Sequence, residues 1–402
     1  MGVHDDAGFR RVHASALPVT GAWRPGDPPG ARRFLRLPAD RPFVLEGGGL
    51  IEGGVDIAYE TWGRLRPDAS NAVLVCHAIT GDSHVAGPLL DGHKTPGWWA
   101  PLVGPGRALD TDDVFVVCVN VLGGCQGTTG PAHPHPADGK PWGSRFPVVS
   151  IRDMVRTQAA VADHLGVARW RSVVGGSMGG MQVLEWATMY PERVGSIVPI
   201  ATCAAATAQQ IGWWSTGRRI IRNDPEWRGG DYYDAEPGGG PHEGLALARM
   251  VSQITFRTDD VFTDRFGRAA VEPLQGGFSL WQRFEVERYL EYHGDKLTRR
   301  FDANSYVLLS KAMDLHDIGR GRGGVEAAVA RMQGPVLAVG VSSDFLYPSY
   351  QSREVVDLAI AAGLRSEYAE IDSAHGHDAF LLEVDQVAEI LTKFLSSLEV
   401  DP

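Results

Sequence analysis

The chain has 402 residues, of which 44% are hydrophobic and 22% are charged, so it is long and apolar enough to bury one large core or two smaller ones. Its formal net charge is −11, so the chain lacks the excess of Lys and Arg by which proteins bind nucleic acids or membrane surfaces. The first residues, MGVHDDAGFRR, lack the apolar region of a secretory signal, and no run of about 18 apolar residues occurs. We therefore expect a soluble, cytoplasmic protein that binds neither nucleic acid nor membrane.

The first part of the chain shows two patterns. Residues 1–40 are rich in Pro, Gly and Arg and have no helical or strand periodicity, which predicts a loosely ordered N-terminal arm. Between residues 43 and 62 hydrophobic and polar residues alternate twice, with glycine-rich turns between the two stretches. This pattern predicts an antiparallel hairpin at the edge of a sheet.

Five later runs are apolar almost throughout, which is typical of strands that are buried on both faces. They are Ala72–Cys76, 114–121, 173–174, 194–200 and Val336–Val341. Segments with helical periodicity lie between them, for instance Ile151–Leu165. Strands that alternate with helices predict an α/β fold with a mostly parallel, doubly wound sheet.

One interval departs from this alternation of strands and helices. The stretch from Cys203 to Pro335 is about a hundred residues longer than the roughly 30 residues that a β-α-β unit needs. It holds amphipathic, helix-like segments such as EGLALARMVSQI and SYVLLSKAMDLHD. We expect residues 204–320 to form an inserted helical lid, and residues 41–203 and 321–402 to form the core. The alternative is that the insertion is only an extra packing layer.

The sequence RSVVGGSMGG, residues 171–180, joins a short apolar strand to a helical segment through glycines around Ser177. In a nucleophile elbow the serine sits in a strained turn, so only glycines fit two residues before and two residues after it. Gly175 and Gly179 meet this requirement. An ordinary glycine-rich strand-to-helix turn is the alternative, because G-x-S-x-G also occurs by chance.

A serine nucleophile needs a base, and the base needs an acid that orients it. In the α/β-hydrolase fold these follow the serine in the order acid, then histidine. Asp344 comes directly after the apolar strand PVLAVGV, and His375 and His377 come after the strand-like run EYAEID. The carboxyl ends of parallel strands are where catalytic groups of open α/β sheets gather. Local sequence favours His377 over His375 only modestly.

An oxyanion hole requires two convergent N–H donors. The N–H of Met178, directly after the serine, is the first candidate, and that of Ile79, in the loop after Ala72–Cys76, is the second. His77 in the same loop is predicted to be a structural hydrogen-bonding residue.

Metal and nucleotide sites have weak support. The pairs His133-x-His135 and His375-x-His377 lie in Pro- or Gly-flanked loops, without helical spacing or nearby cysteines. We therefore predict no metal site. Neither a G-x-G-x-x-G nor a Walker motif appears. The four cysteines are predicted to be buried free thiols: Cys76, Cys118, Cys125 and Cys203.

Taken together, these segments resemble the homoserine O-acetyltransferase family within the α/β-hydrolase fold. The resemblance covers about residues 45–385 and rests on long stretches, among them HAITGDSHVAG, NVLGGCQGTTGP, VVGGSMGGMQVLEWA, FDANSYVLL and GHDAFL. It implies transfer of an acetyl group from acetyl-CoA to the hydroxyl of L-homoserine by a ping-pong route in methionine biosynthesis. Acetyl-CoA is then a co-substrate, and no tightly bound cofactor is expected.

Residue by residue, the resemblance implies that Ser177 is the nucleophile, Asp344 the acid and His377 the base. It also assigns recognition of the amino-acid substrate to Arg249 and Asp378. Two departures concern the substrate contacts: Phe256 stands where a tyrosine is expected, and His375 where the family often has an aromatic residue. We also expect a homodimer, although the physics of the sequence does not determine the oligomeric state.

Several alternatives stay open at this point. The elbow and triad also suit a serine esterase that uses water as the acceptor, and a catalytically silent binding protein is a third interpretation. The acyl group can be acetyl or succinyl, and the acceptor homoserine or serine. A methylene difference is worth only about 1–3 kcal/mol in a pocket. No additional arginine in the elbow or glycine-rich segments offers a partner for a succinyl carboxylate.

Overall fold

The computed structural model describes residues 17–272 and 280–398. At its centre lies an eight-stranded sheet in the order β1-β4-β8-β5-β9-β10-β11-β12. The strands are β1 (Arg33–Arg36), β4 (Asp56–Trp62), β8 (Phe115–Val119), β5 (Ala72–Cys76), β9 (Ser172–Gly176), β10 (Ile197–Ile200), β11 (Val336–Val341) and β12 (Ser366–Ile371). β1 and β4 pair antiparallel with each other, as do β4 and β8, and all pairs from β8 to β12 are parallel. The predicted α/β fold is confirmed.

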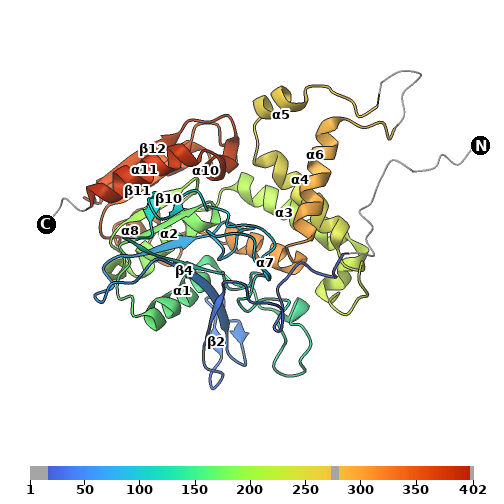
Figure 1. Ribbon diagram of the computed structural model, residues 1–402, viewed down its shortest axis with the longest axis horizontal. Helices are drawn as coiled ribbons and strands as arrows, with labels where there is room; N and C mark the ends of the chain where they lie inside the picture. The colour runs from blue at the N-terminus through green and yellow to red at the C-terminus, as the bar shows by residue number, and fades with distance from the viewer. Residues whose placement is uncertain (1–16, 273–279, 399–402) are drawn as a thin grey trace, which may run out of the picture.

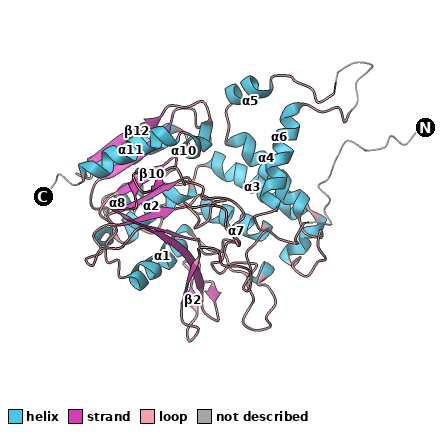
Figure 2. Cartoon of the chain, in the orientation of Figure 1, coloured by secondary structure: helices cyan, strands magenta, loops and turns pink. Residues whose placement is uncertain are grey.

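Both faces of the sheet are buried, as the apolar runs predicted. Leu74 of β5 belongs to the hydrophobic core on one face, whereas its neighbours Val73 and Val75 belong to the core on the other. Helices on the two sides complete these cores, and Figure 2 shows α1 and α11 on opposite sides of the strands. The helices of the core are α1 (Ile151–Leu165), α2 (Met178–Met189), α8 (Val325–Val329), α9 (Ser349–Ala361), α10 (Ala379–Leu382) and α11 (Val384–Ser397).

Helix α1 has the bounds that its periodicity predicted, and its ends have clear local causes. Ser150 and Asp153 form a capping box, in which each side chain accepts a hydrogen bond from the backbone N–H of the other. At the other end, Gly166 adopts a left-handed conformation with φ of 76°, which terminates the helix.

The N-terminal part of the described chain differs from the loosely ordered arm that we expected over residues 1–40. Residues 1–16 lie outside the described residues. From Leu17 onward the backbone follows the core and the insertion: the N–H of Gly21 donates to the carbonyl of Phe301 at 3.1 Å, and β1 adds an antiparallel edge strand beside β4. The edge strand escaped prediction because RFLR is too short to show a period.

The predicted hairpin is present, but it does not form the edge of the main sheet. β2 (Phe43–Val44) and β3 (Leu50–Ile51) pair antiparallel in a separate two-stranded sheet, and β4 alone continues into the central sheet. A second small sheet joins β6 (Val103–Gly104) and β7 (Leu109–Asp110) in parallel.

The insertion forms a group of helices beside the sheet (Figure 1). They are α3 (Ala208–Asn223), α4 (His242–Thr255), α5 (Asp259–Phe266), α6 (Glu285–Thr298) and α7 (Ala303–Asp314), with the 3₁₀ helix η4 (Pro225–Gly230) after α3. The two ends of the insertion meet, since the N–H of Ala206 donates to the carbonyl of His316 and that of Ile318 to the carbonyl of Ala204. The expected lid interval, 204–320, contains all five helices, while its residues 273–279 lie outside the described residues.

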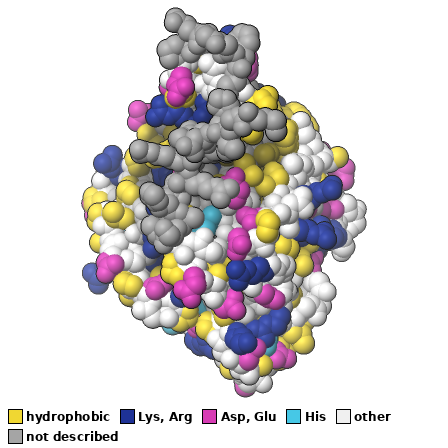
Figure 3. Space-filling model, turned by 90° about the vertical axis from the view of Figure 1, so that its right-hand side faces the viewer, with side chains coloured by type: hydrophobic (Ala, Val, Ile, Leu, Met, Phe, Trp, Pro, Cys, Tyr) yellow, Lys and Arg dark blue, Asp and Glu magenta, His cyan; other side chains and the backbone are white. Residues whose placement is uncertain are grey.

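Two further expectations concern the molecule as a whole. All four cysteines are buried and free, as predicted. Within the described residues, every helix is too short or too polar to cross a membrane. On the face shown in Figure 3, Lys and Arg side chains are interspersed with Asp and Glu side chains.

Candidate active site

Ser177 occupies a sharp turn between β9 and α2. Its backbone has φ of 58° and ψ of −123°, which a residue with a side chain rarely adopts and which costs about 1–3 kcal/mol. The turn is held because the N–H of Ser177 donates to the carbonyl of Ile200 on the neighbouring strand at 2.9 Å. A Cβ on Gly175 or Gly179 would lie only 2.7 or 2.1 Å from the carbonyl oxygen of Cys76. Both glycines of the G-x-S-x-G pattern are therefore required by close packing.

His377 reaches Ser177 from the loop after β12. It lies in the 3₁₀ helix η5 (Gly376–Asp378), with its Nε2 2.9 Å from the Oγ of Ser177. Its Nδ1 lies 2.6 Å from Oδ2 of Asp344. His375 does not line the cavity that contains Ser177, and its backbone N–H donates to the Oγ of Ser373 instead. The structure thus brings His377, and not His375, to the serine.

Asp344 follows β11 and is positioned by its own backbone surroundings. Its Oδ1 accepts hydrogen bonds from the N–H groups of Leu346 and Tyr347, both at 2.9 Å. The other carboxylate oxygen is thereby directed at His377. The ring of Tyr347 packs against the imidazole with 5.0 Å between centroids. Such an arrangement holds the histidine in one tautomer and one orientation.

The electrostatic surroundings of His377 suit a general base. Burial alone lowers the pKa of its imidazole, but the negative charge of Asp344 and the hydrogen bond to it act in the opposite direction. The charge of Asp378 adds to this effect, so that the pKa of His377 is raised above its ordinary value. The imidazolium that forms when His377 accepts a proton is therefore stabilised.

The two predicted oxyanion donors lie near the nucleophile. Met178 is the first residue of α2, so its N–H precedes the intrahelical hydrogen bonds and has no partner in the helix. Ile79 lines the same cavity as Ser177. Within the described part of the chain, neither N–H donates a hydrogen bond to another protein group. Both donors thus stay available for an oxygen that develops negative charge above Ser177.

The cavity above Ser177 has a volume of about 190 Å³ and combines residues from the core and from the lid. Core residues come from the loop after β5, from the elbow and from the segment around His377. Residues of the insertion come from α4, from the position directly after it and from the stretch between α6 and α7. The lining residues are Ala78, Ile79, Thr80, Gly81, Thr95, Trp98, Ser177, Arg249, Phe256, Arg300, His377, Asp378, Phe380 and Leu381.

Arg249 projects from α4 into this cavity. Its guanidinium lies over the ring of Phe256, 5.1 Å from the ring centroid. Among the described residues, no carboxylate lies within ion-pair distance of Arg249. Burial lowers the pKa of Arg249, partly offset by the charge of Asp378, but a guanidinium keeps its proton under all ordinary conditions. The site therefore presents an unpaired cation to a small anionic ligand.

Asp378, directly after His377, forms an ion pair with an arginine of the same protein. The Nη2 of Arg257 lies 3.2 Å from its Oδ2, and both side chains are largely buried. Its backbone N–H donates to the carbonyl of Phe256 at 3.4 Å. The segment directly after α4 is in this way joined to the segment that carries His377.

Arg300 is a cavity residue that the sequence did not reveal. It lies between α6 and α7, in a segment without any motif, and its Nη2 is 3.2 Å from Oδ2 of Asp82. The lid supplies this second arginine, and only the packing of the lid on the loop after β5 brings it to the cavity.

Among the described residues, three lie close enough together to hold a metal ion: Glu60, His84 and His93, with ligand atoms within 4.8 Å of one another. The two imidazoles are stacked, with centroids 3.8 Å apart and an interplanar angle of 17°. Lone pairs in such parallel planes do not converge on one ion. Three of the four ring nitrogens are also engaged: Nδ1 of His84 contacts Glu60, its Nε2 contacts the carbonyl of Pro88, and Nε2 of His93 accepts from the N–H of Ala31. These residues form a hydrogen-bonded cluster and do not fit a metal site.

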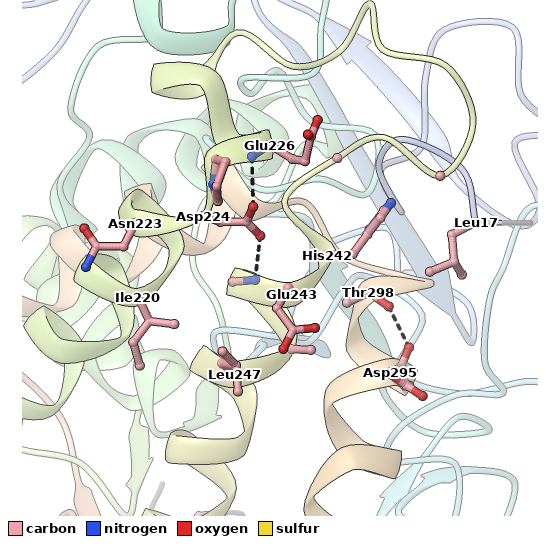
Figure 4. Close-up of a pocket in the computed structure, with 15 residues that line it drawn as sticks. Leu17, Ile220, Asn223, Asp224, Glu226, His242, Glu243, Leu247, Asp295 and Thr298 are labelled. Carbon is pink, nitrogen blue, oxygen red and sulfur yellow. Dashed lines mark hydrogen bonds between the residues drawn. The ribbon is translucent and has the colours of Figure 1, made fainter. Parts of the chain in front are cut away.

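A larger cavity, of about 620 Å³, lies between α3, η4, α4 and α6 (Figure 4). One of its carboxylates, that of Asp224, accepts hydrogen bonds from the backbone N–H groups of Glu226 and Gly244 within the insertion. No residue of the triad lines this cavity. Its acidic lining residues are Asp224, Glu226, Glu243 and Asp295.

Comparisons with known proteins find similarity in both sequence and structure. The family described as the alpha/beta hydrolase fold matches residues 71–384. The chain is 53% identical over 383 residues to the homoserine O-acetyltransferase of Thermobifida fusca, covering 94% of this chain and 98% of that one. It is 51% identical over 357 residues to the homoserine O-acetyltransferase of Moorella thermoacetica, covering 89% and 94%.

Two solved structures show the same architecture. The homoserine O-acetyltransferase from Bacillus anthracis aligns with a TM-score of 0.83 and 30% identity, over 91% of this chain and 97% of that one. The esterase E22 aligns with a TM-score of 0.82 and 28% identity, over 91% of this chain and all of that one. A transferase and an esterase thus share this fold.

Proposed function

The chain belongs to the homoserine O-acetyltransferases, a family with the α/β-hydrolase fold, and on this basis we propose that it transfers an acetyl group from acetyl-CoA to the hydroxyl of L-homoserine. The transfer passes through an acetyl-serine intermediate and serves methionine biosynthesis. The observation that carries the proposed route is the hydrogen-bonded chain from Ser177 through His377 to Asp344.

In the first half-reaction, the Oγ of Ser177 attacks the thioester carbonyl of the donor while Nε2 of His377 removes its proton. The carbonyl oxygen becomes an oxyanion, which the N–H groups of Ile79 and Met178 stabilise. When the tetrahedral intermediate collapses, the C–S bond breaks and the imidazolium protonates the leaving thiolate. Asp344 stays ionised and stabilises the imidazolium between the two proton transfers.

In the second half-reaction, the hydroxyl of homoserine attacks the acetyl-serine and gives its proton to His377. The C–O bond to Ser177 then breaks, and His377 returns a proton to the Oγ. Arg249 binds the carboxylate of the amino acid, because a planar guanidinium forms two parallel hydrogen bonds with a carboxylate. Asp378 binds its α-ammonium.

The charges and size of the cavity support acetyl over succinyl as the transferred group. Arg300 already has Asp82 as its counter-charge, so a succinyl carboxylate would find no unpaired cation there. A cavity of about 190 Å³ also leaves little space once homoserine is bound. Phe256 lines the cavity without a hydroxyl, so it contributes only apolar surface beside the imidazole, 5.7 Å from it between centroids.

A serine esterase is the second candidate, because the esterase E22 shares the fold over the whole of its length. An esterase uses the same acetyl-serine but passes the acetyl group to water. The unpaired Arg249 beside Ser177 favours an anionic acceptor instead, since an esterase for neutral esters has no need of a cation there. We further propose a cytoplasmic homodimer without a tightly bound cofactor, which light scattering and analysis of the purified protein would test.

Two measurements test the proposed function. Incubation with acetyl-CoA and no acceptor should add one acetyl mass to the peptide that contains Ser177, and Ser177→Ala should abolish this adduct and reduce turnover by several orders of magnitude, about 10⁴-fold or more. An unmodified peptide in an enzyme that turns over would refute the acetyl-serine route. Values of kcat/KM for acetyl-CoA and succinyl-CoA against homoserine, serine and water then identify donor and acceptor.

A further inference from the structure

Glu60, on β4, is almost completely buried, with 1% of its surface exposed, and both of its carboxylate oxygens are engaged. Oε1 accepts a hydrogen bond from the Oγ of Ser83 at 2.8 Å, and Oε2 from Nδ1 of His84 at 2.8 Å. Nε2 of His84 lies 3.0 Å from the carbonyl oxygen of Pro88. Since both ring nitrogens of His84 face acceptors, both donate, and the ring is an imidazolium.

The charges around His84 agree with this protonation state. Burial lowers the pKa of His84, but the hydrogen bond and the charge of Glu60 outweigh it, and the pKa is raised above its ordinary value. The stacked ring of His93 lies beside it with a pKa lowered to about 4, chiefly by burial and by the charge of Arg32. Glu60 and His84 therefore form a buried ion pair next to a neutral imidazole.

Ser83 is also hydrogen-bonded to Asn120, a residue directly after another strand of the sheet. Its N–H donates to Oδ1 of Asn120 at 2.8 Å, and Nδ2 of Asn120 donates to the Oγ of Ser83 at 3.0 Å. Asn120 follows β8, the strand that pairs with β4. The backbone and the hydroxyl of Ser83 are thus fixed by Glu60 of β4 and by Asn120, directly after the adjacent strand β8.

These contacts anchor the loop that supplies half of the predicted oxyanion hole. At its start, Nε2 of His77 accepts a hydrogen bond from the N–H of Val121 at 3.2 Å. At its end, Glu60 holds Ser83 and His84. Between these two anchors lies Ile79, which lines the cavity, whereas Glu60 does not. Glu60 can therefore affect the chemistry through the position of this loop.

We propose that Glu60 is a positioning residue for acyl transfer, which keeps the N–H of Ile79 directed at the oxygen of the tetrahedral intermediate by holding Ser83 and His84. This inference rests on the proposed function and adds to it a residue outside the cavity. Oxyanion donors act through preorganisation, so a displacement of the loop by a fraction of an ångström lowers the rate without changing how the acceptor binds.

The test compares Glu60→Gln with Glu185→Gln. Glu185 on α2 is an equally buried glutamate, with 1% of its surface exposed, and it accepts from Arg152 at 3.0 Å and Arg322 at 2.8 Å. Each substitution replaces a buried, ion-paired carboxylate by an amide of the same shape. Both should lower the melting temperature, but only Glu60 contacts the loop of Ile79.

Three quantities are measured for each variant: kcat for acetyl transfer, KM for homoserine, and Ki for methylboronic acid. The boron atom adds reversibly to the Oγ of Ser177, and one of its oxygens then occupies the oxyanion hole. Glu60→Gln should lower kcat about tenfold to a hundredfold and raise Ki by a similar factor, with KM for homoserine unchanged within about twofold. Glu185→Gln should leave all three within about twofold.

Ser83→Ala serves as a second variant if Glu60→Gln does not fold, and it should move kcat and Ki in the same direction by a smaller factor. An unchanged Ki for the boronic acid, or a loss equal to that of Glu185→Gln, would overturn the assignment of Glu60. The boronate readout also separates this inference from the proposed function, because it reports on the oxyanion hole even if the wild-type protein fails to acetylate homoserine.

Discussion

Arg257 forms an ion pair with Asp378, with 3.2 Å between Nη2 and Oδ2, and so joins the segment directly after helix α4 of the insertion to the residue next to His377. The carboxylate that we propose as the partner of the substrate ammonium is thus oriented by an arginine of the lid. We expect Arg257→Gln to raise KM for homoserine about fivefold, because Asp378 loses this orientation. Single-turnover acetylation of Ser177 should stay unchanged, and an equal loss in both half-reactions would contradict the expectation.

Asp378 also influences the titration of His377. Burial lowers the pKa of His377, whereas the charge of Asp344 and the hydrogen bond to it raise this pKa. The charge of Asp378 raises it further. Removing that charge in Asp378→Asn lowers the pKa of the base. Because His377 accepts a proton only when it is neutral, the acidic limb of the kcat/KM profile for acetyl-CoA should move to lower pH.

The matched control for this pH experiment is Glu389→Gln, which removes one negative charge from an exposed position of α11. It should leave the acidic limb in place. A shift of equal size in both variants would mean that net charge, and not the neighbourhood of His377, sets the pKa.

Arg249 is predicted to bind the carboxylate of homoserine. Arg249→Lys keeps the charge but loses the bidentate geometry, so KM for homoserine should rise about tenfold to a hundredfold. The rate of Ser177 acetylation by acetyl-CoA should change by less than about threefold. Arg218→Lys, in an ion pair with Asp314 in the neighbouring helices, is the control for altered lid packing. Equal effects of Arg249→Lys on donor and acceptor would show that Arg249 supports the lid instead.

The elbow is predicted to tolerate no side chain at Gly179. The new Cβ of Gly179→Ala would lie 2.1 Å from the carbonyl oxygen of Cys76, so β5 or the elbow must shift. We expect a loss of about 1–3 kcal/mol of unfolding free energy and a large loss of activity. Gly212→Ala in α3 is the control, because among the described residues no atom beyond the adjoining helical backbone lies within 4 Å of its new Cβ. This helical replacement should stabilise the protein by about 0.4–1 kcal/mol, as measured by denaturant unfolding.

Asp302 is predicted to hold the start of α7 against the N-terminal segment and the lid. Its buried carboxylate accepts hydrogen bonds from the hydroxyls of Thr20 at 2.7 Å, Tyr232 at 2.6 Å and Tyr233 at 3.0 Å. Asp302→Asn replaces an acceptor by a donor that faces these hydroxyls. The free energy of unfolding should fall by about 1–3 kcal/mol, and Tyr232→Phe, which removes one bond, should cost less. A stability equal to that of the wild type would contradict this role.

The sequence by itself determined the α/β fold, the position of the insertion and two residues of the candidate site, Ser177 and Asp344. Apolar runs such as Val336–Val341 reveal their burial by composition alone, because a strand covered on both faces has no polar side. Ser177 was recognisable because its turn permits only glycines around it, and Asp344 because it directly follows such a strand. These are short-range rules, in which a residue and its physical reason lie within a few positions of each other.

Only the tertiary structure decided which groups meet. The family resemblance implies His377, but by local rules His375 and His377 are nearly equivalent, and the hydrogen bond that joins His377 to Ser177 spans 200 positions of the chain. Arg300 lines the cavity because the segment between α6 and α7 packs on the loop after β5. Glu60 contacts the loop that contains Ile79 because β4 packs beside it. β1, only four residues long, becomes a strand because β4 offers it unpaired backbone groups. Such contacts depend on side-chain packing between distant segments, and no periodicity or motif along the chain encodes them.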